Sequence, residues 1–354
     1  MKIKLEGDQE LIETDENSTR EGKPEVVVIT GASAGLGRAI VRRFAEDGAH
    51  IGLVARNIDG LEGAKRDVEN LGGRATIIQG DIADPETSER AAQMVEDEFG
   101  AIDIWINNAM VSVFSPVKEM KPEEYKRVTE VTYLGFVYGT LAALKRMLPR
   151  DRGVIVQVGS ALAYRGIPLQ SAYCASKHAI EGFMDSLRSE LIHDKSNVRA
   201  SAVQMPAMNT TQFSWVKSRL PNNPQPVPPI YQPEIGAEAV HFIAHNNRRE
   251  MYVGYPTVEA IVGNKIVPSI GDWYLGKGGY EAQQTDEPVE PNRTNNLWET
   301  VPGDHGAHGT FDARSIDFSP QLLANKNRGL VLLAGIGVAA GLGLLWKKFS
   351  GQTK

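Results

Sequence analysis

A tyrosine and a lysine four residues apart, Tyr173 and Lys177, form the pair in this chain that is best suited to chemistry. On a helix, residues at i and i+4 share a face, so the ammonium would lie beside the phenol. Free tyrosine loses its proton near pH ~10, and a neighbouring positive charge lowers that pKa. The pair could then act as an acid or base near neutral pH. The same spacing is also found between ordinary surface neighbours, so the rest of the chain has to decide.

A glycine-rich turn supplies the first support. Gly31, Gly35 and Gly37 follow the β-branched run 25–30 and precede a helical pattern. Glycine allows a sharp turn and close backbone approach to a pyrophosphate, whose charge is favoured at a helix N-terminus. A strand, a glycine turn and a helix in this order predict a dinucleotide site.

Four motifs occur in order along the chain, and together they closely resemble those of the classical short-chain dehydrogenase/reductase family. They are Thr30-Gly31-xxx-Gly35-x-Gly37, Asn107-Asn108-Ala109, Ser160 and Tyr173-xxx-Lys177, and the resemblance covers roughly residues 23–254. It implies that Tyr173 is the general acid/base and that Lys177 lowers the tyrosine pKa and holds the nicotinamide ribose. Ser160 would bind the substrate oxygen and steady its negative charge while hydride moves. A serine that only caps the end of a strand is the alternative for Ser160.

The resemblance also implies cofactor contacts. Asn107 would bind the adenosine side and Asp81, with Ile82, the adenine ring; a turn asparagine and a solvated loop acid are the alternatives. Thr210 would contact the nicotinamide carboxamide or, alternatively, cap a helix. The expected cofactor-binding residues are Gly31, Ser33, Gly35, Leu36, Gly37, Arg56, Asp81, Ile82, Asn107, Tyr173, Lys177 and Thr210.

The end of the second strand distinguishes the two nicotinamide cofactors. An acid there would bind the ribose 2′-hydroxyl of NAD, but the chain has Ala55 followed by Arg56. A guanidinium suits a 2′-phosphate, and Ser33 could add a hydroxyl donor. NADP(H) is therefore favoured over NAD(H). If Arg56 is only a solvated loop residue, NAD remains possible.

The chain departs from the family pattern where an asparagine usually holds a water in the proton relay, because Thr132 stands there. A hydroxyl can still bind a water, so Thr132 is included among the catalytic candidates with Ser160, Tyr173 and Lys177. Met110 replaces a usual glycine, and Ala207 follows Pro206 where glycine is usual. These departures leave a second hypothesis, a membrane-anchored NADP(H)-binding sensor or scaffold with little turnover.

Strands alternate with helices along most of the chain. The pattern predicts strands at 25–30, 50–55, 74–79, 102–106, 153–158, 198–204 and 251–255. Alternation of this kind predicts a Rossmann-type α/β fold, with a doubly wound parallel sheet of about seven strands and helices on both faces. The domain would cover residues 23–275. Residues 276–319 are rich in Gly, Pro, Asn and Asp, and we expect them to form most of a poorly structured linker over 276–328.

The two ends of the chain differ from the domain. Residues 1–22 are polar and acid-rich, which predicts a disordered tail and argues against a secretory signal. Residues 329–346 are 18 residues without a charge, and a helix of that length spans about 27 Å, close to a bilayer core of about 30 Å. We expect a transmembrane helix there, with the catalytic domain on the cytoplasmic side; a buried C-terminal helix is the alternative.

Composition limits the partners. The net charge of −6 over 354 residues argues against nucleic acid, and the single cysteine, Cys174, excludes an intramolecular disulfide. His305 and His308 lie in a glycine-rich turn, and we expect no metal site. Aromatic and aliphatic residues in the loop 212–233 suggest an apolar carbonyl or alcohol substrate. The family resemblance implies a homodimer or homotetramer packed through the helices at 122–148 and 171–194.

Overall fold

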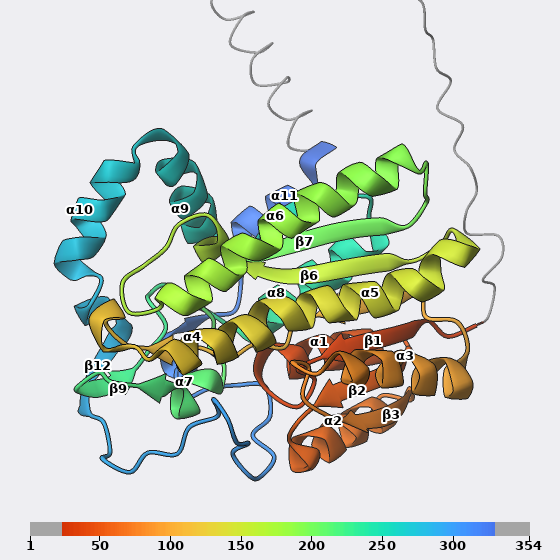
Figure 1. Ribbon diagram of the computed structural model, residues 1–354, viewed down its shortest axis with the longest axis horizontal. Helices are drawn as coiled ribbons and strands as arrows, with labels where there is room; N and C mark the ends of the chain where they lie inside the picture. The colour runs from red at the N-terminus through yellow and green to blue at the C-terminus, as the bar shows by residue number, and fades with distance from the viewer. Residues whose placement is uncertain (1–22, 330–354) are drawn as a thin grey trace, which may run out of the picture.

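The computed structural model describes residues 23–329, and its centre is a parallel sheet of seven strands in the order β11-β7-β6-β4-β1-β2-β3 (Figure 1). The order reverses between β1 and β4, as in Rossmann folds. The strands are β1 (Val26–Thr30), β2 (His50–Ala55), β3 (Arg74–Gln79), β4 (Ile104–Asn107), β6 (Val154–Ser160), β7 (Arg199–Met205) and β11 (Glu250–Tyr252). All seven predicted strands are therefore confirmed, with ends that differ from the prediction by a few residues at most.

Helices cover both faces of the sheet. Residues of α1, α2 and α8 pack into one core with Val27 and Ile29 of β1, while α3, α5 and α6 pack into the other with Val26 and Val28. The alternation along β1 arises because successive side chains of a strand point to opposite faces. The helices are α1 (Gly35–Ala45), α2 (Ile58–Asn70), α3 (Pro85–Phe99), α4 (Pro122–Thr129), α5 (Gly135–Met147), α6 (Ser171–His193) and α8 (Pro233–His245).

The helix predicted over 122–148 is interrupted. Between α4 and α5 the backbone takes one π-helical turn, η2 (Glu130–Leu134), which contains Thr132. Such turns insert a residue into a helix and are frequent at functional sites. The turn brings the Thr132 hydroxyl against the backbone of Val111.

Beyond β11 the chain forms structure that the sequence pattern did not predict. Helices α9 (Tyr255–Ile266) and α10 (Pro268–Gly278) form a hairpin in which α9 contacts the turn η4 (Ala161–Ala163), and Figure 1 shows it projecting from the sheet layers. Most of its large apolar side chains are exposed, so the periodicity that reveals a packed helix is weak.

The prediction of a poorly structured linker over 276–328 is wrong. This segment pairs with the domain through β12 (Gln284–Pro288) on β9 (Asn222–Pro224) and through β13 (Ser315–Ile316) on β10 (Ile230–Tyr231), and it ends in α11 (Pro320–Lys326). Leu297, Ala307 and Leu322 are buried in the two cores. A few buried apolar side chains and many polar contacts hold the segment in place. These residues do not recur at the spacing of a helix or a strand, so the sequence pattern does not reveal them.

None of the helices between residues 23 and 329 combines the length and apolar composition needed to cross a bilayer. The predicted acidic tail lies outside the described residues, as does the predicted transmembrane segment apart from its first residue.

Candidate active site

A cavity of about 750 Å³ lies at the carboxyl ends of the central strands. This is where open α/β sheets bind ligands, at the point where the strand order reverses. Its lining runs from Arg56 and Asp81, past the glycine turn, to Ser160 and Tyr173, and on to Trp273 on α10. The sequence-predicted residues that line it are Gly31, Ser33, Gly35, Leu36, Gly37, Arg56, Asp81, Ile82, Ser160, Tyr173, Lys177 and Thr210.

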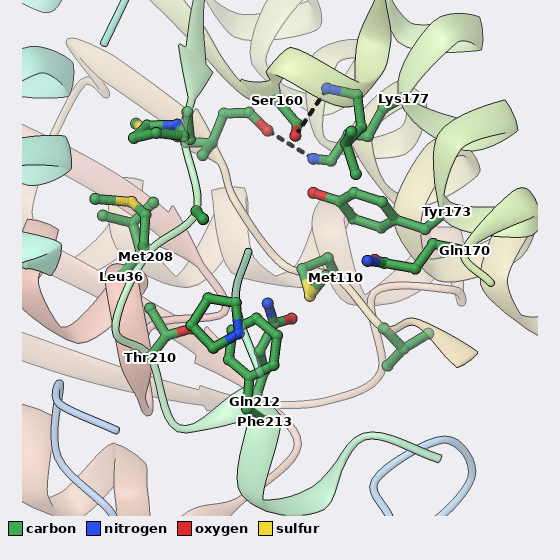
Figure 2. Close-up of a pocket in the computed structure, with 18 of the residues that line it drawn as sticks. Leu36, Met110, Ser160, Gln170, Tyr173, Lys177, Met208, Thr210, Gln212 and Phe213 are labelled. Carbon is green, nitrogen blue, oxygen red and sulfur yellow. Dashed lines mark hydrogen bonds between the residues drawn. The ribbon is translucent and has the colours of Figure 1, made fainter. Parts of the chain in front are cut away.

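Ser160 and Tyr173 meet in the middle of this cavity. Ser160 is the last residue of β6, and Tyr173 lies in the first turn of α6. Figure 2 shows the Tyr173 hydroxyl pointing into the cavity on the side of Ser160. The Ser160 hydroxyl oxygen accepts a hydrogen bond from the Leu162 amide at 3.1 Å, which fixes its orientation.

Lys177 lies one helical turn after Tyr173, but its amine is aimed at the backbone. Its Nζ donates to the carbonyl oxygen of Val158 at 2.7 Å and lies 4.5 Å from the centre of the Phe136 ring. The side chain is 2% exposed, and this burial lowers the pKa of Lys177 to about 7, because a charged amine loses its hydration.

The expected lowering of the tyrosine pKa is not found. Burial raises the pKa of Tyr173 above its ordinary value, and the hydrogen bond with Ser160 offsets this only in part. The Lys177 Nζ is 5.6 Å from the centre of the Tyr173 ring and, with a pKa of about 7, carries little charge at alkaline pH. The cost of burying a phenolate therefore exceeds what this amine contributes.

Behind Ser160 lies a polar cluster that sequence reading missed. Gln204, on β7, accepts the Ser160 N–H through Oε1 at 2.8 Å, and its Nε2 donates to Glu181 and Glu250, each at 2.7 Å. Tyr164 donates to Glu250 at 2.7 Å. Burial and the neighbouring carboxylate of Glu250 raise the pKa of Glu181. The only sequence signal was an amide side chain inside a predicted core strand.

The glycines of the turn are required by its geometry. Gly31 and Gly35 have φ of +69° and +58°, which disfavour side chains. A Cβ on Gly37 would lie 2.0 Å from the carbonyl oxygen of Gly31. A backbone without side chains at these positions leaves room for a pyrophosphate at the start of α1, so the turn fits a dinucleotide.

At the far end of the cavity, Arg56 donates to the carbonyl oxygens of Trp298 at 2.9 Å and Asn296 at 2.6 Å. Asp81 pairs with Arg127 at 2.5 Å and accepts the Ala83 amide at 3.0 Å. Arg56 and Asp81 therefore both line the cavity, and each has a protein partner that the sequence did not indicate.

Asn107 does not reach the cavity. It is fully buried beneath α5, where its amide nitrogen donates to the Phe136 carbonyl and to Thr140, and its oxygen accepts from Trp105. Asn108 lines the cavity instead, and its Nδ2 donates to the Thr30 carbonyl at 3.0 Å. The predicted adenosine contact of Asn107 is therefore wrong, because β4 ends one residue later than predicted and turns this side chain into the core.

Thr132 is also buried and does not line the cavity. Its hydroxyl donates to the Val111 carbonyl at 2.9 Å and accepts the Val111 amide at 3.1 Å. It fixes the chain that follows Met110, a residue of the cavity wall. In this arrangement Thr132 holds the backbone, and its role in a proton relay stays a prediction.

The end of the cavity formed by α7 and α10 is apolar. Phe213 and Trp215 of α7 (Gln212–Trp215) line it, as do Trp273 and Tyr274 of α10, which sequence reading did not identify. Other apolar residues of the loop 212–233 are core residues: Leu220, Ile230 and Tyr231. Among residues 23–329 there is no cluster of three side chains suited to hold a metal.

Comparison with known proteins identifies the family of this chain as the short-chain dehydrogenases. Residues 25–219 match the family model described as short chain dehydrogenase. The chain is 32% identical to an uncharacterized oxidoreductase, YxnA, of Bacillus subtilis over 285 residues, which are 80% of each protein. It is 36% identical to dehydrogenase/reductase SDR family member 7B of Mus musculus over 182 residues, half of this chain and 56% of that protein.

Solved structures share the fold. A metagenomic short-chain oxidoreductase in complex with NADP is 27% identical, with a TM-score of 0.55 over 65% of this chain and 97% of that one. An alcohol dehydrogenase of Thermococcus sibiricus complexed with 5-hydroxy-NADP is also 27% identical, with a TM-score of 0.56 over 65% of this chain and 95% of that one.

Proposed function

Because the chain belongs to the short-chain dehydrogenase/reductase family, oxidoreductases that act on alcohol and carbonyl groups, we propose that it interconverts an apolar carbonyl compound and its alcohol with NADP(H). The observation that carries the proposal is the meeting of Ser160 and Tyr173 in a cavity that continues to a glycine turn. The bound nicotinamide would supply or accept the hydride.

In the direction of reduction, the Tyr173 hydroxyl gives its proton to the substrate oxygen as hydride reaches the carbon. The Ser160 hydroxyl donates a hydrogen bond to the same oxygen and stabilises its developing negative charge. The oxygen of Ser160 is already held by the Leu162 amide, and the hydroxyl hydrogen that bonds Tyr173 would turn to the substrate oxygen when a substrate binds. Oxidation reverses both steps, with Tyr173 taking the proton.

The preference for NADP(H) is supported by charge. Arg56 lines the adenosine end, and the end of β2 carries no carboxylate that would repel a 2′-phosphate. The Asn296 and Trp298 carbonyls that Arg56 bonds carry no formal charge, and the carboxylates of Asp81 and Glu299 act on it only through space, so its guanidinium can still attract a phosphate. Two structurally similar proteins are described with NADP and 5-hydroxy-NADP.

Tyr173→Phe tests the proposal. We expect NADPH-dependent turnover of a carbonyl panel to fall at least a thousandfold, while NADPH fluorescence still reports binding. Tyr138→Phe, on α5 and away from the cavity, is the matched control and should keep full activity. Turnover by Tyr173→Phe at the wild-type rate would contradict the assignment.

Arg56→Ala tests the cofactor preference. We expect KM for NADPH to rise about ten- to a hundredfold and KM for NADH to change little, because one charge-assisted contact is lost. Arg74→Ala, on β3 with its side chain 59% exposed, is the control. Equal efficiency with both cofactors in the wild type, unchanged in Arg56→Ala, would refute the preference.

A second candidate is an NADP(H)-binding sensor or scaffold. Thr132 favours it, because this hydroxyl is occupied by Val111 and leaves the proton relay incomplete. A wild type that binds NADPH but turns over no member of a broad panel of ketones and alcohols would favour this candidate. The membrane anchor at 329–346, the cytoplasmic side and the homo-oligomer remain proposals from the sequence and the resemblance.

A further inference from the structure

Residues 293–309, here called the strap, run across the whole dinucleotide end of the cavity. The strap follows β12 and returns over the glycine turn to the loop after β7 (Figure 1). It begins at Arg293, which donates to the carbonyl oxygens of Ser214 at 3.0 Å and Val216 at 3.1 Å on the substrate side. Asn296, Thr300 and Val301 of the strap line the cavity itself.

The first part of the strap holds both adenosine-side residues. The Asn296 and Trp298 carbonyls accept from Arg56. The Leu297 carbonyl accepts from Nε of Arg127, the partner of Asp81, at 3.0 Å, and Leu297 itself is fully buried. The positions of the two side chains that would meet the adenosine therefore depend on residues 296–298.

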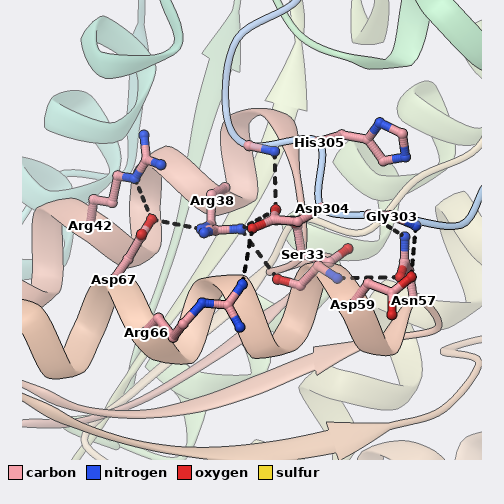
Figure 3. A network of polar contacts seen from close by, with 12 residues as sticks. Ser33, Arg38, Arg42, Asn57, Asp59, Arg66, Asp67, Gly303, Asp304 and His305 are labelled. Carbon is pink, nitrogen blue, oxygen red and sulfur yellow. Dashed lines mark hydrogen bonds and ion pairs between the residues drawn. The ribbon is translucent and has the colours of Figure 1, made fainter.

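The middle of the strap is closed by an ion pair. Asp304 accepts from Arg38 at 2.9 Å, and Arg38, with its side chain 3% exposed, also donates to Asp67 at 2.8 Å (Figure 3). Arg38 Nη1 reaches the Ser33 carbonyl of the glycine turn at 3.3 Å. The same arginine therefore touches the cofactor loop and the strap.

Two more strap contacts flank this pair. Nδ2 of Asn57 donates to the Val301 carbonyl at 2.8 Å and to the Gly303 carbonyl at 3.0 Å. The Gly303 amide in turn donates to Asp59 at 2.7 Å. Asn57 and Asp59 lie at the start of α2, directly after Arg56, so the strap follows the edge of the adenosine site.

The last part of the strap reaches the pyrophosphate and nicotinamide ends. The Gly306 carbonyl accepts the Gly35 amide at 2.9 Å, at the N-terminus of α1. His308 forms an antiparallel bridge with Thr210, the predicted nicotinamide contact. One continuous segment thus bonds residues beside every part of the expected dinucleotide.

We propose that the strap is a cofactor latch, a segment that must open at Asp304 to admit or release the dinucleotide and that positions Arg56 when closed. This inference rests on the proposed function, in which the cavity holds a nicotinamide dinucleotide. The strap is suited to opening because it contains no helix or strand, and its grip on α1 and α2 is polar apart from Ala307. A strap that served only as a buttress would leave the rate of cofactor exchange unchanged.

The packing of Asp304 against α2 allows the latch to be locked. A Cβ built on Gly63 would lie 2.5 Å from Cγ of Asp304, and its three nearest atoms all belong to that side chain. Cysteines at both positions would have Cβ atoms within about 4 Å, the range of a disulfide. We therefore choose the double variant Gly63→Cys/Asp304→Cys. Wild type with and without oxidant treatment is the control for oxidation of Cys174.

The measurement is NADPH exchange followed by stopped-flow fluorescence, without a substrate. In the oxidised variant we expect preloaded NADPH to leave at least tenfold more slowly than in the reduced variant, and reductant should restore the rate. Equal rates before and after reduction, with the disulfide confirmed by mass, would overturn the latch.

Asp304→Asn gives a second measurement that needs no crosslink. It removes the charge that faces Arg38 while it preserves shape, so NADPH dissociation should accelerate about three- to tenfold. Asp286→Asn, exposed on β12, is the control. An unchanged dissociation rate in Asp304→Asn would also count against the latch. If the wild type binds NADPH but neither the disulfide variant nor Asp304→Asn changes its dissociation rate, the latch alone is refuted. If the wild type binds neither NADPH nor NADH, the proposed function and the latch are refuted together.

Discussion

At the scale of single residues, the most unusual group is the buried amine of Lys177. The amine is enclosed by Phe136 and donates to the Val158 carbonyl, and no carboxylate is within ion-pair distance of it among the described residues. Among the residues that the structure describes, Glu181 favours the ammonium from a distance. Folding therefore costs free energy when the amine is charged, and this cost depends on pH.

The first prediction concerns this linkage. The pKa of Lys177 falls from 10.5 to about 7 on folding, so between these values the unfolded chain binds more protons than the folded one. Stability is thus depressed below pH 7 and recovers as pH rises from 7 towards 10.5. Between about pH 7 and about pH 9.5, wild type should gain about 2–3 kcal/mol of unfolding free energy relative to Lys177→Met, as measured with urea.

Lys118→Met, exposed on the 3-10 turn η1 (Val117–Glu119), controls for the loss of a surface charge. Its stability should follow that of wild type across the same range. If wild type and Lys177→Met change in parallel with pH, the depressed pKa of Lys177 is wrong.

Residue types and spacing predicted which side chains face the cavity. They predicted the contacts of those side chains less well. Tyr173 and Ser160 face one cavity as expected, because each follows from a strand end or a helix start. Asn107 was misplaced because β4 runs one residue further than predicted, so Asn107 stays within the sheet with its side chain towards α5. The partners of Arg56 could not be predicted, since they are backbone carbonyls about 240 residues away.

At the scale of elements, β6 and β7 are joined side by side at the site. Gly159, the residue before Ser160, faces Gln204 across the ladder, and a Cβ there would lie 2.2 Å from the Gln204 Oε1. The glycine therefore allows the amide that holds the Ser160 N–H to fit.

The second prediction follows from this contact. Gly159→Ala should push Gln204 aside and break its bond to Ser160, so kcat should fall about ten- to a hundredfold while KM for NADPH changes little. Gly182→Ala on α6, where an added Cβ meets nothing within 4 Å, is the matched control. Loss of NADPH binding together with kcat would instead indicate general unfolding, which circular dichroism would detect.

The third prediction concerns the end of the strap. Although burial lowers the pKa of His308, the hydrogen bonds to Glu234 at 2.9 Å and Asp312 at 2.8 Å raise it above the ordinary value of 6.5. The closed strap then binds the His308 proton more tightly than an open strap does. Closure is favoured at low pH and weakens as pH rises through the raised pKa.

NADPH dissociation from wild type should therefore accelerate between about pH 6 and about pH 9, and His308→Gln should lose most of this dependence. His193→Gln, exposed at the end of α6 and outside the strap, is the control. A pH profile that His308→Gln leaves intact would assign the dependence to another group.

Elements with a clear period were predictable and the strap was not. The seven strands are short runs of apolar residues, and the helices between them repeat apolar residues every three or four positions. Both patterns are visible in the sequence. The strap contributes two buried apolar residues, Leu297 and Ala307, in a stretch rich in turn residues. The strap is held in one conformation by its contacts with the domain beneath it, and the sequence of the strap alone does not indicate these contacts.

At the scale of the whole molecule, exposed apolar side chains gather on the hairpin of α9 and α10. Those at least 40% exposed are Tyr255, Val262, Ile266, Val267, Ile270, Trp273 and Tyr274. Trp273 and Tyr274 also line the substrate end of the cavity. Apolar side chains therefore line the cavity where it meets α10, which supports the proposal of a lipophilic substrate.

The fourth prediction joins this arrangement to the uncharged stretch that begins at Gly329. If residues 329–346 form the anchor that the sequence predicts, full-length protein should sediment with membranes and resist extraction by high salt. A chain that ends at residue 328 retains α11 and should keep NADPH binding and turnover of soluble ketones. Its turnover of a ketone dissolved in vesicles should fall several-fold relative to the full chain, because only the anchored enzyme meets that substrate at the bilayer. If the chain of 354 residues were found entirely in the soluble fraction, the anchor would be refuted. If both chains turned over the ketone in vesicles equally fast, the anchor would have no role in access to the substrate.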